Sequence, residues 1–181
     1  MKKSYFLGLV MACAISFGLT ERLAAQSPVK LSIGLEGGIP TGDASDIYSA
    51  AGGVSLNVRV PLPLTNLDVI GSVGYQQWFV KGDFKDTFEN LGFNISNFGF
   101  LPIKAGLRYG FGFTPLYVKF DLGPAITIKE AIEGGDSGTA MTYSPGLGAK
   151  LGPLEAELKY DIYSKDGTQS FVGLKLSYYL F

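Results

Sequence analysis

The chain has 181 residues, the size of a single domain. Its 15 Lys+Arg and 16 Asp+Glu give a formal net charge of −1, which argues against a nucleic-acid partner, because that needs a clustered basic surface. There is no His, and the single cysteine is Cys13 near the N-terminus. Disulfides, a thiol nucleophile and Cys/His zinc sites are therefore not expected, and we predict neither a metal nor a cofactor.

The N-terminal segment has the plan of a secretory signal peptide. Lys2 and Lys3 precede an apolar run over residues 5–19, and small residues follow up to Ala25. The run is too short and too rich in Ala, Gly and Ser for a membrane span. We expect a signal peptide over residues 1–26, with cleavage near Ala25 or Gln26.

The stretch "VMAC" at Val10–Cys13 offers an alternative, because it loosely resembles a lipoprotein acylation site. In that case Cys13 would carry a lipid anchor. The apolar run before Cys13 would then be only seven residues long, and it continues after the cysteine. The signal-peptide interpretation fits this pattern better.

Beyond residue 28, apolar residues recur with a period of two, which is typical of strands with two different faces. No stretch keeps a helical period over three turns. In "LEAELKYDIY", for example, Leu154, Leu158 and Ile162 alternate with Glu155 and Asp161. Eight segments show the pattern: 29–39, 54–60, 67–79, 101–109, 116–128, 141–151, 154–163 and 172–180.

All charged residues of these segments fall on the polar parity, so the register of each strand is well specified. Eight are basic: Lys30, Arg59, Lys104, Arg108, Lys119, Lys150, Lys159 and Lys175. Six are acidic: Glu36, Asp68, Asp121, Glu155, Glu157 and Asp161.

The connections alternate in length. Longer polar segments such as "KGDFKDTFENLGFNISN" follow the first, third and fifth strands, the shorter "SKDGTQ" follows the seventh, and tight turns such as "GP" follow the others. Long connections at one end of an antiparallel meander are typical of membrane barrels, and ten-residue segments suit a tilted spanning strand. We predict an all-β fold over residues 27–181, an eight-stranded antiparallel up-and-down transmembrane β-barrel.

A soluble lipocalin-like barrel that binds an apolar ligand would alternate in the same way, with the apolar row inside. Two features favour the apolar row outside. Small residues such as Gly34 and Gly106 are frequent on the charged parity, where they would make room for long side chains in a narrow lumen. Tyrosines such as Tyr75 and Tyr160 lie on the apolar row, where membrane boundaries would satisfy their hydroxyls.

The chain resembles the small eight-stranded outer-membrane β-barrels of Gram-negative bacteria, of the OmpX and OmpA-barrel type. The signal peptide, the opening "LSIGLEGGIPTGD", the alternation of connections and the terminal "LKLSYYLF" carry this resemblance. It implies an outer-membrane location, contact with membrane lipids, and insertion by the outer-membrane assembly machinery. That machinery would recognise the last strand through Tyr178, Leu180 and Phe181.

Two features depart from the family pattern. The apolar row ends at Leu180, so Phe181 falls on the opposite parity; either a bulge resets the phase or Phe181 lies just past the strand. Pro102, Pro124 and Pro145 fall inside predicted strands, where each removes a ladder donor. We expect bulges at these prolines, with Pro124 and Pro145 close together across their hairpin.

An eight-stranded barrel has room in its lumen only for side chains. The inward charges are therefore expected to pair into a network that plugs the interior, with a narrow porin-like channel as the alternative. The pair Glu155 and Glu157 superficially resembles hydrolase carboxylates, but salt bridges explain it better, and we expect no enzyme. The expected network comprises Arg59, Lys104, Arg108, Lys119, Asp121, Glu155, Glu157, Lys159, Asp161 and Lys175.

The long connections are acidic, with nine Asp or Glu against four Lys, a net charge of −5. Such a surface could bind divalent cations or a basic partner, although ordinary solvated loops explain it better. Phe84, Phe88 and Phe93 are the candidate contacts of the longest loop, because a solvated loop needs few aromatics. We predict a monomeric structural barrel, or one that contacts an unknown extracellular partner through its loops.

Overall fold

The computed structural model describes residues 29–63, 65–83, 97–129, 138–165 and 167–180. Each period-two segment of the sequence corresponds to a strand of its own, within one residue at the ends of β1 and β8. The strands are β1 (Lys30–Thr41), β2 (Tyr48–Pro61), β3 (Leu67–Val80), β4 (Phe98–Gly110), β5 (Leu116–Lys129), β6 (Thr139–Leu151), β7 (Leu154–Ser164) and β8 (Thr168–Tyr179).

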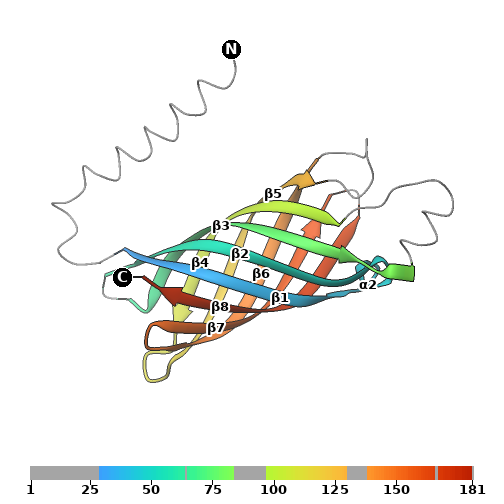
Figure 1. Ribbon diagram of the computed structural model, residues 1–181. Helices are drawn as coiled ribbons and strands as arrows, with labels where there is room; N and C mark the ends of the chain where they lie inside the picture. The colour runs from blue at the N-terminus through green and yellow to red at the C-terminus, as the bar shows by residue number, and fades with distance from the viewer. Residues whose placement is uncertain (1–28, 64, 84–96, 130–137, 166, 181) are drawn as a thin grey trace, which may run out of the picture.

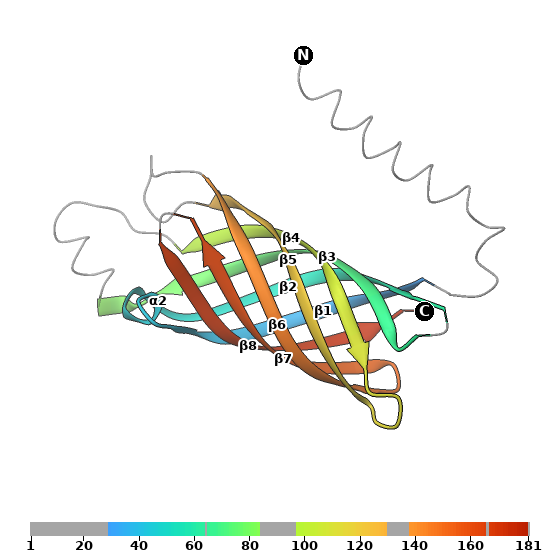
Figure 2. The ribbon, with the colours of Figure 1, turned by 180° about the vertical axis from the view of Figure 1, so that it is seen from behind.

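The strands form a closed antiparallel barrel in which each one pairs with its neighbours in sequence (Figures 1 and 2). The ring closes between the first and last strands, from the pair Ser32–Tyr179 to the pair Thr41–Ser170. Closure leaves no free sheet edge, and edges are the usual sites of unwanted strand pairing. The predicted eight-stranded up-and-down barrel is thus confirmed.

The two ends of the barrel differ. Tight turns join β2 to β3, β4 to β5 and β6 to β7 at the end where β1 begins and β8 finishes, which we call the turn end (Figure 1). The longer connections lie at the opposite, loop end. There the β1–β2 connection contains a one-turn helix, α2 (Ala44–Ile47). Among the described residues, no helix is long and apolar enough to cross a membrane.

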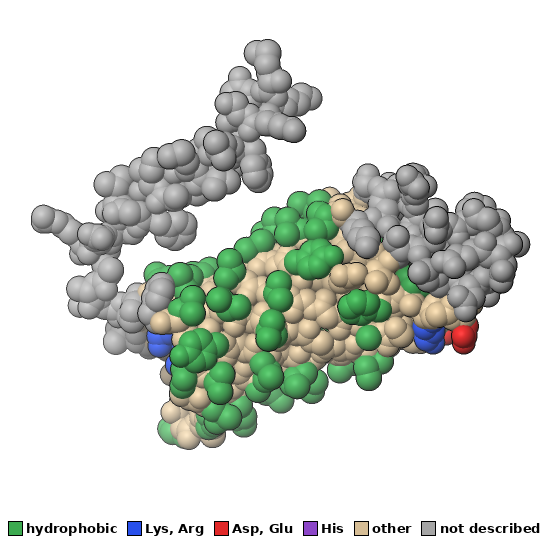
Figure 3. Space-filling model, in the orientation of Figure 1, with side chains coloured by type: hydrophobic (Ala, Val, Ile, Leu, Met, Phe, Trp, Pro, Cys, Tyr) green, Lys and Arg blue, Asp and Glu red, His purple; other side chains and the backbone are tan. Residues whose placement is uncertain are grey.

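The apolar row of every strand faces outward. Leu35 is 63% exposed, and Leu107 and Leu174 are each at least half exposed, although the barrel is closed. In the face that Figure 3 shows, hydrophobic side chains are spread along the whole wall, and charged ones appear only near its two ends. The charged parity faces the lumen. This polarity is the reverse of a lipocalin, and it excludes the soluble alternative because water would contact the whole apolar wall.

The expectation of bulges at the three strand prolines is wrong. Near Pro102, Val73 pairs with Ile103 and Gln76 with Phe100, so the β3–β4 register is the same on both sides. The registers beside Pro124 and Pro145 also continue unchanged.

The two register shifts of the sheet lie elsewhere, at Tyr48/Ala50 and at Gly99/Phe100, near the loop end. Pro124 and Pro145 are also not cross-strand neighbours, since they pair with Met141 and Phe120 respectively. Each proline forgoes its ladder bond locally, and the flanking pairs hold the register.

Close packing inside the narrow barrel depends on glycine at particular positions. A Cβ atom on Gly38 would lie 2.3 Å from the carbonyl oxygen of Val172 and 2.5 Å from Cδ2 of Phe171. On the adjacent Gly37, which faces outward, the nearest atom would be 4.0 Å away. Gly38 therefore makes room for a lumen side chain, and Gly37 does not.

Candidate functional site: the lumen and its outer mouth

The lumen is divided into two zones along the barrel axis. From the turn end to the middle, the inward side chains are charged or polar and lie largely in ion pairs. Toward the loop end they are aromatic. We call these zones the polar half and the aromatic half.

Two arginines fill the polar half near the turn end. Both guanidinium groups share the same two carboxylates: Arg59 lies 3.5 Å from Asp68 and 3.9 Å from Glu155, and Arg108 lies 3.4 Å and 3.1 Å from them. Arg108 also stacks 3.7 Å above the ring centre of Tyr117. Arg59, Asp68 and Arg108 lie on the adjacent strands β2, β3 and β4, and Glu155 meets them from β7 across the lumen.

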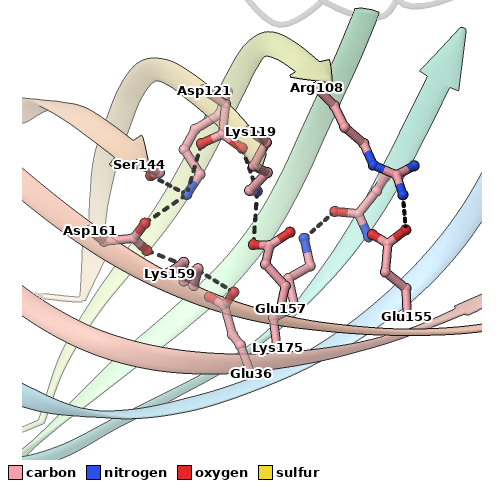
Figure 4. Close-up of polar contacts among 12 residues, drawn as sticks. Glu36, Arg108, Lys119, Asp121, Ser144, Glu155, Glu157, Lys159, Asp161 and Lys175 are labelled. Atoms are coloured by element: carbon pink, nitrogen blue, oxygen red, sulfur yellow. Dashed lines mark hydrogen bonds and ion pairs between the residues drawn. The ribbon is translucent and has the colours of Figure 1, made fainter. Parts of the chain in front are cut away.

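Lysines and acids alternate in a continuous series at mid-barrel (Figure 4). Every lysine in the series lies between two carboxylates, at nitrogen–oxygen distances from 2.5 to 3.7 Å. Alternation of this kind compensates charges that would otherwise be costly to bury. The series runs Glu157, Lys119, Asp121, Lys104, Asp161, Lys159 and Glu36.

Tyr117 joins the arginine group to this series. Its hydroxyl donates a hydrogen bond to Glu155 at 2.8 Å and lies 3.2 Å from Glu157. Tyr179 donates a second hydrogen bond to Glu155, at 2.9 Å. The two carboxylates that resemble a hydrolase pair in sequence are therefore held by Arg, Lys and Tyr partners, an arrangement that suits a structural role.

Lys175 balances the charge of the polar half. The pairs above contain six carboxylates and five cations, and Lys175 supplies the sixth positive charge. Its ammonium group donates a hydrogen bond to the amide oxygen of Asn57 at 2.5 Å. Beside it remains a cavity of about 40 Å³, room for a few water molecules. The six carboxylates and six cations of this buried group thus balance, while Lys30 and Lys150 of the same parity lie half-buried at the turn end.

Five rings fill the aromatic half, with Trp78 at the centre and fully buried. The ring of Trp78 meets the other four at centroid distances from 5.2 to 6.1 Å, in edge-to-face geometry. Such geometry is favourable for aromatic pairs. Tyr163 also donates a hydrogen bond to the side chain of Gln76. The four partners of Trp78 are Tyr48, Phe100, Tyr163 and Phe171.

The structure places all ten residues of the expected charge network in the polar half. Sequence reasoning missed the aromatic half, although the signal was present: Trp78 shares the parity of Asp68, and Tyr163 shares that of Asp161. Phe98 and Phe100, which directly follow the longest connection, belong to β4, and Phe100 is buried.

The other predicted contacts stand as follows. Phe84, Phe88 and Phe93 lie outside the described residues, as does Phe181. Tyr178 and Leu180 face outward, about half exposed, and the Leu180 amide donates a hydrogen bond to the carbonyl of Leu31. The end of the chain is therefore tied to β1 at the point of closure.

A closed barrel with an apolar outer wall and a charge-compensated lumen suits a lipid environment. The apolar wall is favourable in contact with lipid, and the closed sheet pairs its backbone groups internally, as a lipid environment requires. The class defined by fold and lumen is a small transmembrane β-barrel of eight strands. The outward tyrosines on β3, β6, β7 and β8 fit the aromatic girdles of such barrels.

Comparison with solved structures agrees with this class. Two structures of Ail, the attachment invasion locus protein of Yersinia pestis, match with TM-scores of 0.53 and 0.55 at 17% identity, over 85% of this chain and 98% of Ail. One of them is a complex with the heparin analogue sucrose octasulfate. Neisserial surface protein A matches with a TM-score of 0.42 at 12% identity, over 83% of this chain and 96% of that protein.

No protein-family model and no curated protein matches the sequence. At 17% identity the two Ail matches establish the fold and nothing further. The chain has the fold of the small eight-stranded outer-membrane β-barrels.

Proposed function

We propose that the protein is a non-enzymatic outer-membrane barrel that is closed to solutes and acts at the cell surface through its loop end. Residues 1–26 serve as a signal peptide, and residues 27–181 form the barrel. The observation that carries the proposal is the filled lumen. Side chains occupy its full described length, with neutral ion-pair networks in one half and five packed rings in the other.

The first experiment concerns location and fold. The full chain is expressed in a Gram-negative host, membranes are fractionated, and gel mobility is compared with and without boiling in SDS. We expect the protein in the outer-membrane fraction, with faster migration of the unboiled form because the closed barrel resists SDS. Recovery of a folded chain in the aqueous fraction without detergent would contradict the proposal.

The second experiment separates a plug from a channel. The purified, refolded protein is inserted into planar bilayers, and single-channel currents are recorded. We expect no stable openings, because the packed rings of the aromatic half leave no continuous water path through the lumen. Steady ion-selective openings would favour the narrow channel and count against a closed barrel.

The acidic loops support a cationic partner. The long connections contain nine acidic residues and four lysines, whereas Ail was crystallised with a polyanion. Like charges disfavour encounter, so we expect weak binding to heparin and stronger binding to polylysine. The measurement uses protein in zwitterionic lipid nanodiscs. The control variant neutralises Asp43, Asp46, Glu130 and Glu133 as amides; equal polylysine binding by this variant would remove the case for a cationic partner.

A further inference from the structure

A cavity of about 390 Å³ opens at the loop end, above the rings of the aromatic half. Five parts of the chain that are distant in sequence form its walls: α2, β4, β5, β6 and the β7–β8 region. This volume lies within the range of small-molecule sites in proteins, and such sites are concave and mostly apolar with a few polar groups. Its apolar lining consists of Ala44, Ile47, Phe98, Phe100, Ala140 and Tyr163.

The aromatic rings in this lining are fixed by one another. Phe98 and Phe100 meet edge to face at 4.4 Å, and Phe100 and Tyr163 stack at 5.0 Å with an interplanar angle of 13°. Trp78 supports both Phe100 and Tyr163 from within the lumen. The apolar wall is thus already organised, and a ligand need not pay to order it.

The mouth of the cavity is polar. Asp43, Thr127, Thr168 and Gln169 contribute to its lining and supply both hydrogen-bond donors and acceptors. An occupant therefore meets rings in the interior and polar groups at the opening. A flat, rigid ring suits such walls, since rings attract one another in stacked and edge-to-face geometry, and it loses little conformational entropy on binding.

We propose that this cavity, the mouth pocket, binds a small aromatic molecule that carries a polar substituent. The ring lies against Phe98, Phe100 and Tyr163, and the substituent lies at the polar rim. The pocket differs from a lipocalin site because it lies at the mouth of the barrel, while the lumen below is filled. That the pocket opens on the outside of the cell rests on the proposed function. Binding of the aromatic molecule does not.

The protein contains a suitable reporter, since Trp78 is its single tryptophan and lies one ring away from the pocket. Bromine quenches tryptophan fluorescence at short range. Trp78 is buried in the lumen, so probe dissolved in the lipid phase contributes only a weak, linear background. A saturable component would therefore report occupation of the mouth pocket.

The probe is 2-(4-bromophenyl)ethanol, titrated into the refolded full chain in lipid vesicles. The comparison compound is 6-bromohexan-1-ol, which has the same polar group and halogen but no ring. We expect saturable quenching by the aromatic probe and only linear background from the alkyl compound. Absence of saturable quenching by the aromatic probe overturns the proposal, and equal saturable quenching by both compounds overturns its aromatic specificity.

Two variants locate the site. Ala140→Phe fills the pocket from β6, and Ile47→Phe fills it from α2. Each should therefore weaken the binding of the aromatic probe at least about tenfold. Ala149→Phe is the matched control, because Ala149 lies on the outward face of the same β6 strand. Folding is checked by unboiled gel mobility, and Ile47→Phe decides alone if Ala140→Phe fails to fold. Unchanged quenching in a folded filling variant, or equal loss in Ala149→Phe, overturns the assignment.

Discussion

The two halves of the lumen solve one problem in different ways. An eight-stranded ring must fill its interior with side chains. The polar half does so with alternating charges and retains a water-sized cavity, whereas the aromatic half does so with rings around a fully buried Trp78. Damage should differ accordingly: a deletion in the aromatic half leaves a void, and a deletion in the polar half leaves an unpaired charge. The dry, ring-packed part of the lumen thus lies toward the loop end, and the charged part with its water-sized cavity lies toward the turn end.

The largest effect is expected from removing the centre of the aromatic half. Trp78→Ala deletes a side chain in contact with four rings, and such cavities cost about 3–5 kcal/mol in soluble cores; we expect the upper part of that range. The measurement is the urea midpoint, followed by unboiled gel mobility. The neighbour Phe79 faces outward, so Phe79→Ala should cost no more than about half as much. Equal losses would mean that Trp78 is not the centre of packing.

The next effect tests charge compensation in the polar half. Lys159→Met removes the cation between Glu36 and Asp161 and leaves Glu36 buried without its ion-pair partner. Breaking a buried pair costs about 3–5 kcal/mol, and the lower part of the range applies because Asp161 keeps Lys104.

Lys30→Met is the matched control for this prediction. Lys30 begins β1 at the turn end and is partly exposed, so we expect a change within about 0.5 kcal/mol. Unfolding is followed by Trp78 fluorescence in both variants. If Lys159→Met proves as stable as the wild type, the series of ion pairs does not hold the lumen together.

A smaller effect tests the packing limit between the two halves. Gly38→Ala would place a methyl group 2.3 Å from a backbone oxygen and 2.5 Å from the Phe171 ring, and such overpacking costs about 1–3 kcal/mol. Gly37→Ala places its methyl group 4.0 Å from its nearest non-neighbouring atom and should be neutral or slightly stabilising. Denaturant unfolding compares the two. Equal stability of the variants would show that the Gly38 contact relaxes freely.

The smallest effect concerns the link between the arginine group and the lysine series. Tyr117→Phe removes the hydroxyl that donates to Glu155, at a cost of about 1–1.5 kcal/mol, since Glu155 keeps Arg108 and Tyr179 as partners. Tyr143→Phe, on the lipid-facing wall, should change stability by less than about 0.5 kcal/mol. A larger loss at Tyr143 than at Tyr117 would argue that wall contacts outweigh the buried hydrogen bond.

Strand identity, register and the outward face follow from the sequence because the side-chain period in a strand is two, and a one-residue slip would reverse every strand. Leu35, Leu107 and Leu174 face outward as their parity predicts. The pairing of individual charges does not follow from parity alone. Lys104, for example, reaches Asp161 across the lumen from a distant strand, and only the closed ring brings them within 3.4 Å.

The aromatic half and the mouth pocket escape sequence reasoning for a related reason. Trp78 and Phe171 lie on the inward parity, but a rule based on hydrophobicity places large rings on the outer row. Their burial depends on five strands converging, which no local pattern encodes. The unshifted registers beside the prolines also could not be predicted from a local pattern, because the flanking pairs of the closed sheet outweigh one missing ladder bond.

The pairing of β1 with β8 also governs how the fold can be reached. Ser32 meets Tyr179, so the last contact to form joins segments near opposite ends of the described chain. Contacts of such long sequence separation carry a large loop-closure entropy and slow the search. Until that seam forms, the two outermost strands are open templates for other chains. The barrel should therefore assemble in one late, cooperative step, with aggregation as the competing outcome.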